Sequence, residues 1–544
     1  MQDVSRLFQE PKAERRPSDE DSPVSPSDKE KYDKESQYTS ELSSPQDSAP
    51  PSAGDSLPKA QPPVVPPGPP PPQWSLLHEY AFIFNICLAQ FITLAALAQT
   101  IAPLLLIGHQ MKVRHPGQLS WFTAAYSMSL GTFILPAGRI GDMYGHKRVF
   151  MFGWLWFGIW SLIAGFGYSQ GPIFFSVARG FQGIGPALVV PNAMALVGRT
   201  FPIGNKRNMV FSLFAACGPT GFVMGAAMSS LLAERLWWPW ALWITAVVCA
   251  LAAIFSYLVI PASMSRPATP PGQDPPKFDF LGCGLGVSGL ILINFSLNQA
   301  PIVGWPTAYI YFILLIGLML TVAFIYIEMY HAEHPLLPLR GLQKQAIFAL
   351  ACIAAGWASH GIWLYYFYMF LMRVRGVGPV SATACLAPVA PIGVAWALST
   401  GVLLRKTHVS LVMFAAMMFF FIGTVLLAFV PERQSYWLQT FFSVIIMPGG
   451  MNLSFPAGTI LLSNAMPREH QGKAASLVST VVNYSIASGL GFAGSVERSV
   501  VLKAERTGNM DVMVGYRGGW FLGCGLSGLG VLISLYFVWV SRKR

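Results

Sequence analysis

The chain has 544 residues, of which 53% are hydrophobic and 11% are charged, and its mean hydropathy is +0.48. An average soluble domain carries roughly 25% charged residues, so a soluble fold could not hide this much apolar surface, and lipid must be the solvent for most of the chain. The formal net charge of +11 does not indicate nucleic-acid binding, because the basic residues are scattered through short links between apolar runs instead of forming one basic face.

The first segment, residues 1–73, is rich in Pro and Ser, is acidic overall and ends in the run PPVVPPGPPPP. Such a composition cannot bury enough apolar surface to offset the entropy of ordering, and the proline run favours an extended conformation. We therefore expect a disordered cytoplasmic tail.

After this tail, fourteen apolar runs are long enough to cross a bilayer, which takes about 20 residues in a helix. Irregular backbone is not tolerated in lipid, so these runs predict an all-α membrane protein. The predicted spans are 80–107, 119–138, 149–169, 172–198, 208–233, 239–260, 279–299, 308–328, 345–371, 380–404, 409–430, 436–466, 474–496 and 518–540. The links on the tail's side hold more Lys and Arg than the opposite links, which predicts that both termini are cytoplasmic.

The seven cysteines all fall inside apolar runs, and no CxxC pair or other ligand spacing occurs. We interpret them as small packing residues. Neither a metal nor a cofactor is expected.

An internal repeat relates residues 185–202 to residues 450–467 at a constant offset. The matching pairs are Gly185 with Gly450, Leu188 with Leu453, Pro191 with Pro456 and Pro202 with Pro467. A charged inner link follows each segment. Two related halves are the architecture expected of a transporter whose bundles rock around a central site.

The inner link between the second and third predicted spans, GRIGDMYGHKR, concentrates charge and turn chemistry. Its glycines permit a tight turn and close helix contact, and Asp142 is placed to cap a helix and to pair with a neighbouring Arg. The pattern resembles the signature of the major facilitator superfamily, whose Asp latches the cytoplasmic ends of two bundles when the transporter faces outward. An ordinary positively charged inner loop is the alternative. The residues of this inner-gate motif are Gly138, Arg139, Gly141, Asp142, Gly145, Lys147 and Arg148.

Two further motifs lie inside predicted spans, RGFQGIGPA in the fourth and CGPTGFVMGAA in the fifth. An arginine inside a span is costly and is rarely there for packing alone, so we expect Arg179 to pair with a polar partner, the substrate or a proton-bearing group. The first motif resembles the superfamily's R-x-x-Q-G-x-G pattern, and the second is similar to the antiporter motif of exporters, in which Gly and Pro permit tight packing and a bend. The motif residues are Arg179, Gln182, Gly183 and Gly185, followed by Gly218, Pro219, Gly221 and Gly225.

With fourteen predicted spans and this antiporter motif, the chain resembles members of the fourteen-spanner drug:proton antiporter branch of the superfamily. The resemblance implies the major facilitator fold, with an N-terminal six-helix bundle at 74–266, two extra linking helices within 267–340 and a C-terminal six-helix bundle at 341–544. It also implies alternating access driven by proton entry. The second half's counterpart of the inner link, GVLLRKTHV, lacks an Asp, so a second latch is in doubt.

Longer segments, including GWASHGIWLYYFYMF and SFPAGTILLSNAMPREHQGKAASLV, resemble the fungal aminotriazole-resistance and boron-efflux transporters. This resemblance implies an exporter of small toxic molecules, such as boric acid/borate or aminotriazole- and azole-like drugs, in a fungal plasma membrane, with a vacuolar membrane as the alternative. The expected partners are a small solute, protons and the bilayer, with no nucleic acid, and the expected state is a monomer.

Two titratable residues are candidates for the proton-carrying group. Proton relays in membranes usually use Asp, Glu or His, and His360 is the one such side chain near the middle of a predicted span. A hydrogen-bonded core histidine is the commoner alternative. Glu497, which closes the thirteenth span, is the second candidate.

Solute-binding candidates come from aromatic and amide side chains. Trp357, Tyr365 and Tyr368 share one face of the ninth span, and aromatic walls with hydroxyl groups bind planar or boronic solutes. Interfacial anchoring of the tyrosines is the competing interpretation. Asn452 and Asn483 lie in the twelfth and thirteenth spans, although such amides often only join helices.

Other functions share part of this pattern. An efflux pump for a fungal secondary metabolite or toxin would show every motif named above. A non-transporting nutrient sensor would keep the fold, but it would be expected to carry a long structured tail or loop. An enzyme is not indicated, because no HExxH motif, nucleophile elbow or phosphate-binding loop occurs.

Overall fold

A computed structural model describes residues 74–542, except 114, 116, 203, 266–277, 333–335, 338–342, 467–473 and 509–510. The tail at 1–73, for which disorder is predicted, lies outside the described residues. Every regular element that the structure describes is a helix, as expected for a backbone that must satisfy its own hydrogen bonds in lipid. The predicted all-α class is confirmed.

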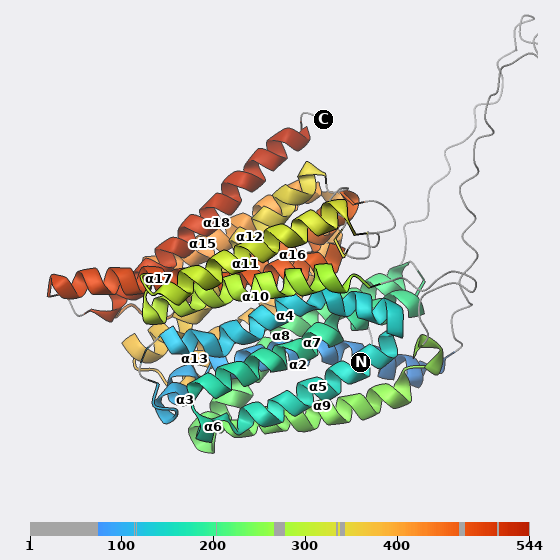
Figure 1. The fold of residues 1–544 in the computed structure, drawn as a ribbon, viewed down its shortest axis with the longest axis horizontal. Helices are drawn as coiled ribbons and strands as arrows, with labels where there is room; N and C mark the ends of the chain where they lie inside the picture. The colour runs from blue at the N-terminus through green and yellow to red at the C-terminus, as the bar shows by residue number, and fades with distance from the viewer. Residues whose placement is uncertain are drawn as a thin grey trace, which may run out of the picture. The chain divides into compact units, whose positions relative to one another are not determined.

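The first half of the chain supplies six helices long enough to cross a bilayer (Figure 1). They are α2 (Leu76–Ile101), α4 (Gly117–Tyr144), α5 (His146–Gly165), α7 (Pro172–Thr200), α8 (Asn205–Arg235) and α9 (Pro239–Val259). Shorter elements are α3 (Leu104–Gln110), α6 (Gly167–Gln170) and the 3₁₀ turn η1 (Ala262–Ser265). Pro172 and Pro239 begin α7 and α9, at positions where a missing N–H leaves no helical bond unmade.

The rest of the chain supplies two linking helices and a second set. The linking helices are α10 (Phe280–Val303) and α11 (Ala308–Tyr330). The second set comprises α12 (Lys344–Met369) with the π-helical turn η3 (Phe370–Val374), α13 (Pro379–Leu386), α14 (Val389–Lys406), α15 (Val409–Ala428), α16 (Gln439–Asn464), α17 (Ala474–Arg506) and α18 (Val512–Arg542). The short α13 and α14 together make one crossing of 28 residues.

Thirteen crossings within the described ranges are long and apolar enough to span a membrane. The remaining helix of crossing length, α4, has 28 residues, and its hydropathy is lower than that of the thirteen crossings. Its polar side chains Thr123, Ser127 and Thr132 are buried against neighbouring helices, so α4 needs less apolar surface than a helix that faces lipid. The predicted count of fourteen spans agrees with these helices.

The two sets of helices pack in the same pattern. In the first set α5 packs on α7 and α9, and α2 packs on α8; in the second set α15 packs on α16 and α18, and α12 packs on α17. The repeat segments 185–202 and 450–467 begin in α7 and α16, which occupy equivalent places. Pro191 and Pro456 lie inside these two helices. The repeat in the sequence therefore corresponds to a repeat in packing.

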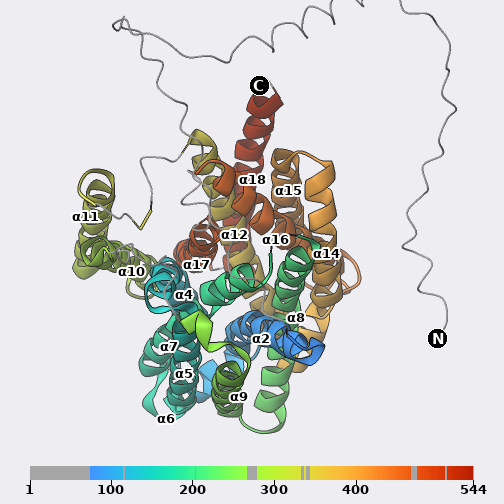
Figure 2. The same cartoon turned by 90° about the vertical axis from the view of Figure 1, so that its right-hand side faces the viewer.

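Two seams join the sets. At one seam α4 packs on α17, and at the other α8 packs on α13 and α14. The linking helix α10 contacts both α4 and α17, whereas α11 packs mainly on α10 (Figure 2). Only 11% of the apolar window of α11 is buried, so this helix presents most of its surface to lipid.

Candidate transport site and gates

The turn between α4 and α5 carries the inner-gate motif. Gly145 has φ of +92°, a conformation that side-chain-bearing residues rarely adopt. A Cβ at Gly141 would overlap Oδ1 of Asn192 on α7. A Cβ at Gly138 would lie 3.6 Å from Oγ of Ser476 on α17. The glycines thus allow α4 to turn sharply and to lie against both α7 and α17.

Asp142 of this motif has partners within the first set of helices. Its Oδ1 lies 3.4 Å from Nε2 of His146, and the charge of Arg199 on α7 acts on the carboxylate. These partners hold α4 to α5 and α7. The latch to the second set stays a prediction, because the opposing link at 467–473 lies outside the described residues.

Lys147 ties the start of α5 to the end of α9. Its Nζ donates to the Tyr257 carbonyl oxygen at 2.9 Å and to the Ile260 carbonyl oxygen, and it lies 5.2 Å from the Tyr257 ring. A cation is favourable at the C-terminal end of a helix, where carbonyl groups lack helical partners. Arg148 is exposed, and Arg139 is half-buried.

Arg179 of α7 is fully buried and its donors reach uncharged groups. Nε donates to the Phe122 carbonyl oxygen at 3.1 Å, and Nη2 donates to the Ala96 carbonyl oxygen at 3.0 Å. Nη2 also donates to Thr100 Oγ1 at 3.3 Å, and Nη1 donates to Gln182 Oε1. The guanidinium therefore links α2, α4 and α7. The polar partners expected for Arg179 are backbone carbonyls and neutral side chains.

Gln182 and Tyr126 complete this network. Gln182 Nε2 donates to Ser161 Oγ of α5 at 2.6 Å. The Tyr126 ring lies 4.5 Å from the Arg179 guanidinium carbon, which permits a cation–π contact, and its hydroxyl donates to the Thr93 carbonyl oxygen at 2.9 Å. The fourth-span motif thus joins four helices of the first set.

Four motif glycines lie where two helices touch. A Cβ at any of them would meet the main chain or the first side-chain atom of the facing helix, so a larger residue would push the helices apart. These contacts place Gly183 against Tyr126, Gly185 against Phe157, Gly221 against Phe91 and Gly225 against Ala95.

Of the other two residues of the antiporter motif, Pro219 faces the seam and Gly218 faces α2 of its own set. A Cβ on Gly393 of α14 would lie 2.7 Å from Cβ of Pro219, so this proline touches the second set of helices. A Cβ on Gly218 would lie 3.5 Å from Nε2 of Gln90 on α2. The motif therefore combines packing within one set with contact between the two sets.

Asn452 and Asn483 both lie near the seams and are half-buried. Each Nδ2 donates to the carbonyl oxygen one turn earlier in its own helix, at 2.9 and 3.0 Å. A Cβ on Gly393 would lie 3.5 Å from Asn452 Nδ2, and a Cβ on Gly131 of α4 would lie 3.0 Å from Asn483 Cβ. The two amides thus face different seams. Proline at 456 frees the Asn452 carbonyl oxygen, which accepts from Thr400 Oγ1 at 3.3 Å.

The aromatic residues of α12 do not gather around one cavity. Trp357 Nε1 donates to Ser454 Oγ of α16 at 3.0 Å, and Tyr368 is fully buried with its hydroxyl 3.3 Å from Thr383 Oγ1 of α13. His360 is 6% exposed and packs on the rings of Trp357, Trp363 and Phe420 inside the second set. Its Nδ1 has no partner among the described residues.

Glu497 lies with Tyr365 in a cluster between α12, α17 and α18. The Tyr366 hydroxyl donates to Glu497 Oε2 at 2.8 Å, and the charge of Arg373 acts on the same carboxylate. The Tyr365 ring meets the Tyr366 ring edge-on at 5.1 Å, and Tyr516 of α18 lies 5.5 Å from Tyr366. Tyr366 and Arg373 are not among the residues predicted from the sequence. Tyr366 lies on the helical face next to the predicted one, and the position of Arg373 at a span end was the available signal.

A second group that was not predicted from the sequence lies at the end of the α8 seam remote from the inner-gate motif. Glu234 Oε1 accepts from the Val380 N–H at 2.8 Å, so a carboxylate of the first set caps the N-terminus of α13. Ser230 Oγ lies 3.0 Å from Thr383 Oγ1, which also contacts the Tyr368 hydroxyl. These contacts, here termed the outer clasp, join the two sets directly.

Loops beyond the spans stabilise the outer end of the second set. Arg375 Nε donates to the Glu432 carbonyl oxygen at 3.3 Å, and burial lowers the pKa of this guanidinium. The Tyr436 hydroxyl donates to the Cys385 carbonyl oxygen at 2.6 Å, and burial raises the pKa of Tyr436 to about 12. The raised pKa keeps the Tyr436 hydroxyl protonated near neutral pH.

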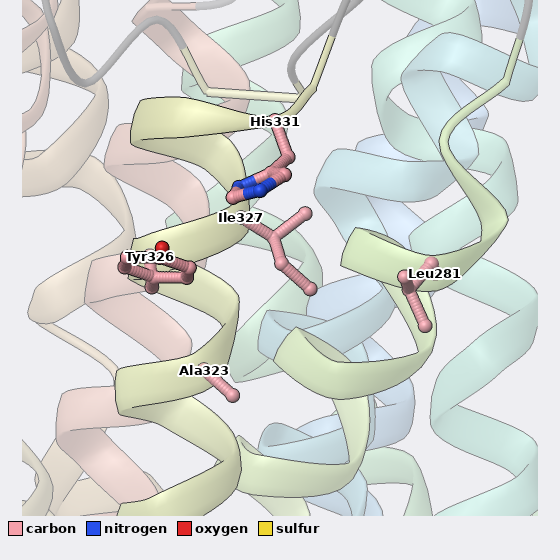
Figure 3. Close-up of a pocket in the computed structure, with 5 residues that line it drawn as sticks. All are labelled: Leu281, Ala323, Tyr326, Ile327 and His331. Carbon is pink, nitrogen blue, oxygen red and sulfur yellow. The ribbon is translucent and has the colours of Figure 1, made fainter.

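A shallow hollow between α10 and α11 lies apart from all these groups (Figure 3). It is lined by Leu281, Ala323, Tyr326, Ile327 and His331. The lining is mainly apolar and belongs to the hairpin that faces lipid. We assign it no part in transport.

Two sets of six crossings with matching packing, joined along two seams, are the architecture of a membrane transporter built from two related bundles. The family model of the Major Facilitator Superfamily matches residues 82–492. The chain belongs to this superfamily. It is therefore a transporter and not an enzyme.

Relatives in fungi agree with the predicted branch. The low affinity ammonium transporter of Saccharomyces cerevisiae is 49% identical over 86% of this chain and 91% of its own length. The efflux pump terJ of Aspergillus terreus is 43% identical over 85% of this chain and 88% of its own. The aminotriazole resistance protein of S. cerevisiae is 34% identical over 85% of this chain and 84% of its own length. The predicted resemblance to fungal drug-efflux and aminotriazole-resistance proteins is confirmed.

A solved structure supports the fold. The peptide transporter PepTSo, of the POT family, aligns with a TM-score of 0.62 at 14% identity, covering 87% of this chain and 99% of that structure. At this identity the likeness concerns the fold alone.

Proposed function

We propose that the chain is a proton-coupled exporter of small, uncharged toxic solutes, working by alternating access of bundles at 74–266 and 341–544. The proposed location is the plasma membrane, with both termini in the cytoplasm. The inner-gate motif would close the inner face, and the outer clasp would close the opposite face.

One observation carries the proton coupling. Glu497 is a carboxylate inside the second bundle, hydrogen-bonded to Tyr366 and close to Arg373. A carboxylate held by one hydroxyl and one cation can bind and release a proton with a change in local charge and hydrogen bonding. His360 is a weaker candidate, because aromatic rings enclose it.

The polar groups near the middle of the seams favour an uncharged solute. Asn452 and Asn483 are amides that donate and accept hydrogen bonds without carrying charge. The Asp and Glu residues of the described helices lie away from the helix centres. A cation in the middle of the membrane would lack a carboxylate partner there. Boric acid and aminotriazole can hydrogen-bond to these groups, and Trp357, whose Nε1 donates to Ser454 of the Asn452 helix at 3.0 Å, supplies aromatic surface nearby.

Ammonium is a second candidate cargo, because the relative with 49% identity is named a low affinity ammonium transporter. The uncharged form, ammonia, would meet the same amides. An exporter of a fungal metabolite remains a third, since terJ and terG of A. terreus are named efflux pumps. A non-transporting sensor would move none of these solutes.

The decisive test uses the full chain in proteoliposomes with an imposed pH gradient. We expect the gradient to drive boric acid or aminotriazole against its concentration difference. Glu497→Gln should abolish the response to the gradient while exchange of solute across the membrane without a gradient continues. Glu505→Gln, an exposed change on the same helix, is the matched control.

The outcomes separate the candidates. Gradient-driven movement of ammonium alone would replace the proposed cargo. Full gradient-driven transport in Glu497→Gln would refute the assigned proton site, and no movement of any solute would favour the sensor. Labelling of tags at both termini in intact cells should occur only after permeabilisation, and earlier labelling would overturn the proposed orientation.

A further inference from the structure

Two glycines of α18 lie beside the hydrogen bond between Tyr366 and Glu497, and no motif named above includes them. Gly515 and Gly519 are buried and are four residues apart, so they lie on one face of the helix. The helix α18 packs on α12, which carries Tyr366, and on α17, which carries Glu497. The two glycines therefore decide how closely α18 approaches both partners of this bond.

Gly515 leaves room for the side chain of Glu497. A Cβ at this position would lie 3.1 Å from Glu497 Cγ, 3.8 Å from Glu497 Oε1 and 2.8 Å from Cγ2 of Val501. Carbon atoms that are not bonded to each other are most stable at about 3.5–4.0 Å. Alanine at this position would therefore displace the Glu497 side chain or separate this turn of α18 from α17.

Gly519 leaves room for the ring of Tyr366. A Cβ at this position would lie 2.6 Å from Cε2 and 2.8 Å from Cζ, the ring carbon that bears the hydroxyl. Tyr366 is 1% exposed, and the rings of Tyr365, Tyr516 and Trp520 lie beside it at centroid distances of 5.1, 5.5 and 6.4 Å. Because a rigid ring moves as a whole, pressure at Cζ would also shift the hydroxyl.

The hydrogen bond depends on this spacing. The Tyr366 hydroxyl donates to Glu497 Oε2 at 2.8 Å, which is near the most frequent length for a bond between two oxygen atoms. Moving the ring away from a new Cβ to an ordinary contact distance takes a displacement of about 1 Å. A displacement of that size along the bond would break it, and one across the bond would misalign it.

The other charged and titratable groups near the carboxylate do not replace this bond. Arg373 of η3 acts on the carboxylate through its positive charge. Tyr365 of α12 and Tyr516 of α18 lie in the same cluster, and the buried Tyr516 hydroxyl has no partner among the described residues. On α17 the guanidinium of Arg498 donates to a carbonyl oxygen of α10 at 2.8 Å. Within the described ranges, the Tyr366 hydroxyl is thus the group that donates a hydrogen bond to Glu497.

We propose that Gly515 and Gly519 are positioning residues, which set the hydrogen bond between Tyr366 and Glu497 through the space that they leave on α18. Neither glycine touches the transferred proton. Substitution of either one would weaken the bond without removing its donor or its acceptor. This geometric role is independent of the carried solute, whereas its consequence for proton coupling rests on the proposed function above.

The first test is infrared spectroscopy of the full chain in lipid nanodiscs, with the Glu497 side-chain band assigned by its loss in Glu497→Gln. Tyr366→Phe should shift this band, because the hydroxyl donor is removed. Gly519→Ala should shift the band in the same direction, and the double variant should shift it no further than Tyr366→Phe alone. Gly525→Ala, an exposed change on the same helix with open space around the new Cβ, should leave the band in place.

Two results of this test would overturn the proposal. An unshifted band in Gly519→Ala would show that the glycine does not set the bond. Additive shifts in the double variant would show that Gly519 acts on the carboxylate by a route other than the Tyr366 hydroxyl.

The second test compares two measurements in proteoliposomes, solute accumulation driven by a pH gradient and solute exchange without a gradient. The probes are boric acid and aminotriazole. For Gly515→Ala and Gly519→Ala, we expect gradient-driven accumulation to fall severalfold more than exchange, because the altered bond belongs to the proton site. A merely structural role would lower both activities by the same factor, and that result would overturn the proposal. Gly525→Ala should lower neither activity.

Glu497→Gln separates the two proposals. If this variant keeps its full response to the gradient, the proposed function is refuted, while the infrared shifts still test the positioning role. If it loses the response but both glycine variants keep theirs, the positioning role alone is refuted.

Discussion

At the scale of single residues, Arg179 is the buried charge with the largest hydrogen-bond network. The guanidinium reaches three separate directions at once, toward Phe122, Ala96 and Gln182. An ammonium group is a point donor on a flexible stem and cannot reproduce this planar arrangement. The identity of the side chain, and not only its charge, is therefore required.

We predict that Arg179→Lys lowers the thermal unfolding midpoint of the purified protein and reduces transport. Each hydrogen bond from the charged guanidinium that the ammonium does not replace costs about 1.5–3 kcal/mol. Differential scanning fluorimetry and proteoliposome transport measure the two effects. Arg433→Lys, at an exposed position outside the motifs, should change neither. A stable and active Arg179→Lys would show that charge alone suffices.

At the scale of elements, the antiporter motif separates into packing glycines and seam residues. Gly225 lies where α8 crosses α2, and a Cβ there would come 2.7 Å from the Ala95 carbonyl carbon. A Cβ at Gly218 would lie 3.5 Å from the flexible Gln90 amide nitrogen. The two glycines of this motif therefore differ in the size of side chain that can replace them.

We predict that Gly225→Val destabilises the first bundle by about 1–3 kcal/mol, because the two helices must separate. Gly218→Ala should unfold at the parent temperature. Thermal unfolding in the same detergent compares the two variants. Equal midpoints in both would contradict the division of the motif.

At the scale of the whole molecule, the contacts between the two bundles differ from those that hold the linking hairpin. The outer clasp joins the two bundles through Ser230 and Thr383, whereas α10 is fastened to α17 by the Asn294 amide, which donates to Ser488 Oγ at 3.0 Å. Asn298 Nδ2 also donates to the Ala487 carbonyl oxygen at 3.1 Å. The linking hairpin is thus hydrogen-bonded to the second bundle.

We predict that a disulfide between Ser230→Cys and Thr383→Cys, in a variant lacking the native cysteines, arrests transport by holding the outer clasp shut. Reduction should restore transport. A disulfide between Asn294→Cys and Ser488→Cys should leave transport intact, because both residues would move together. Transport through a fully cross-linked outer clasp would refute rocking at this seam.

Much of the architecture could be predicted from the sequence. Because a helix that crosses lipid must be long and apolar, the lengths of the apolar runs in the sequence identified the crossings. Links containing charged residues marked many of the boundaries between them. The repeat of Pro191 and Pro456 anticipated the equivalence of α7 and α16. The membership of the superfamily also followed, because the motif at 138–148 combines glycine, acid and base in one turn.

The sequence by itself determined the solvent of the chain, the number of crossings and the motif positions, because these depend on local composition and spacing. Only the tertiary structure decided which side chains meet. Tyr366 reaches Glu497 across 131 positions, Glu234 reaches Val380 across 146, and His146 reaches Asn192 across 46. Such pairs depend on the rotation and depth of separate helices, which packing between distant segments sets and no local pattern records.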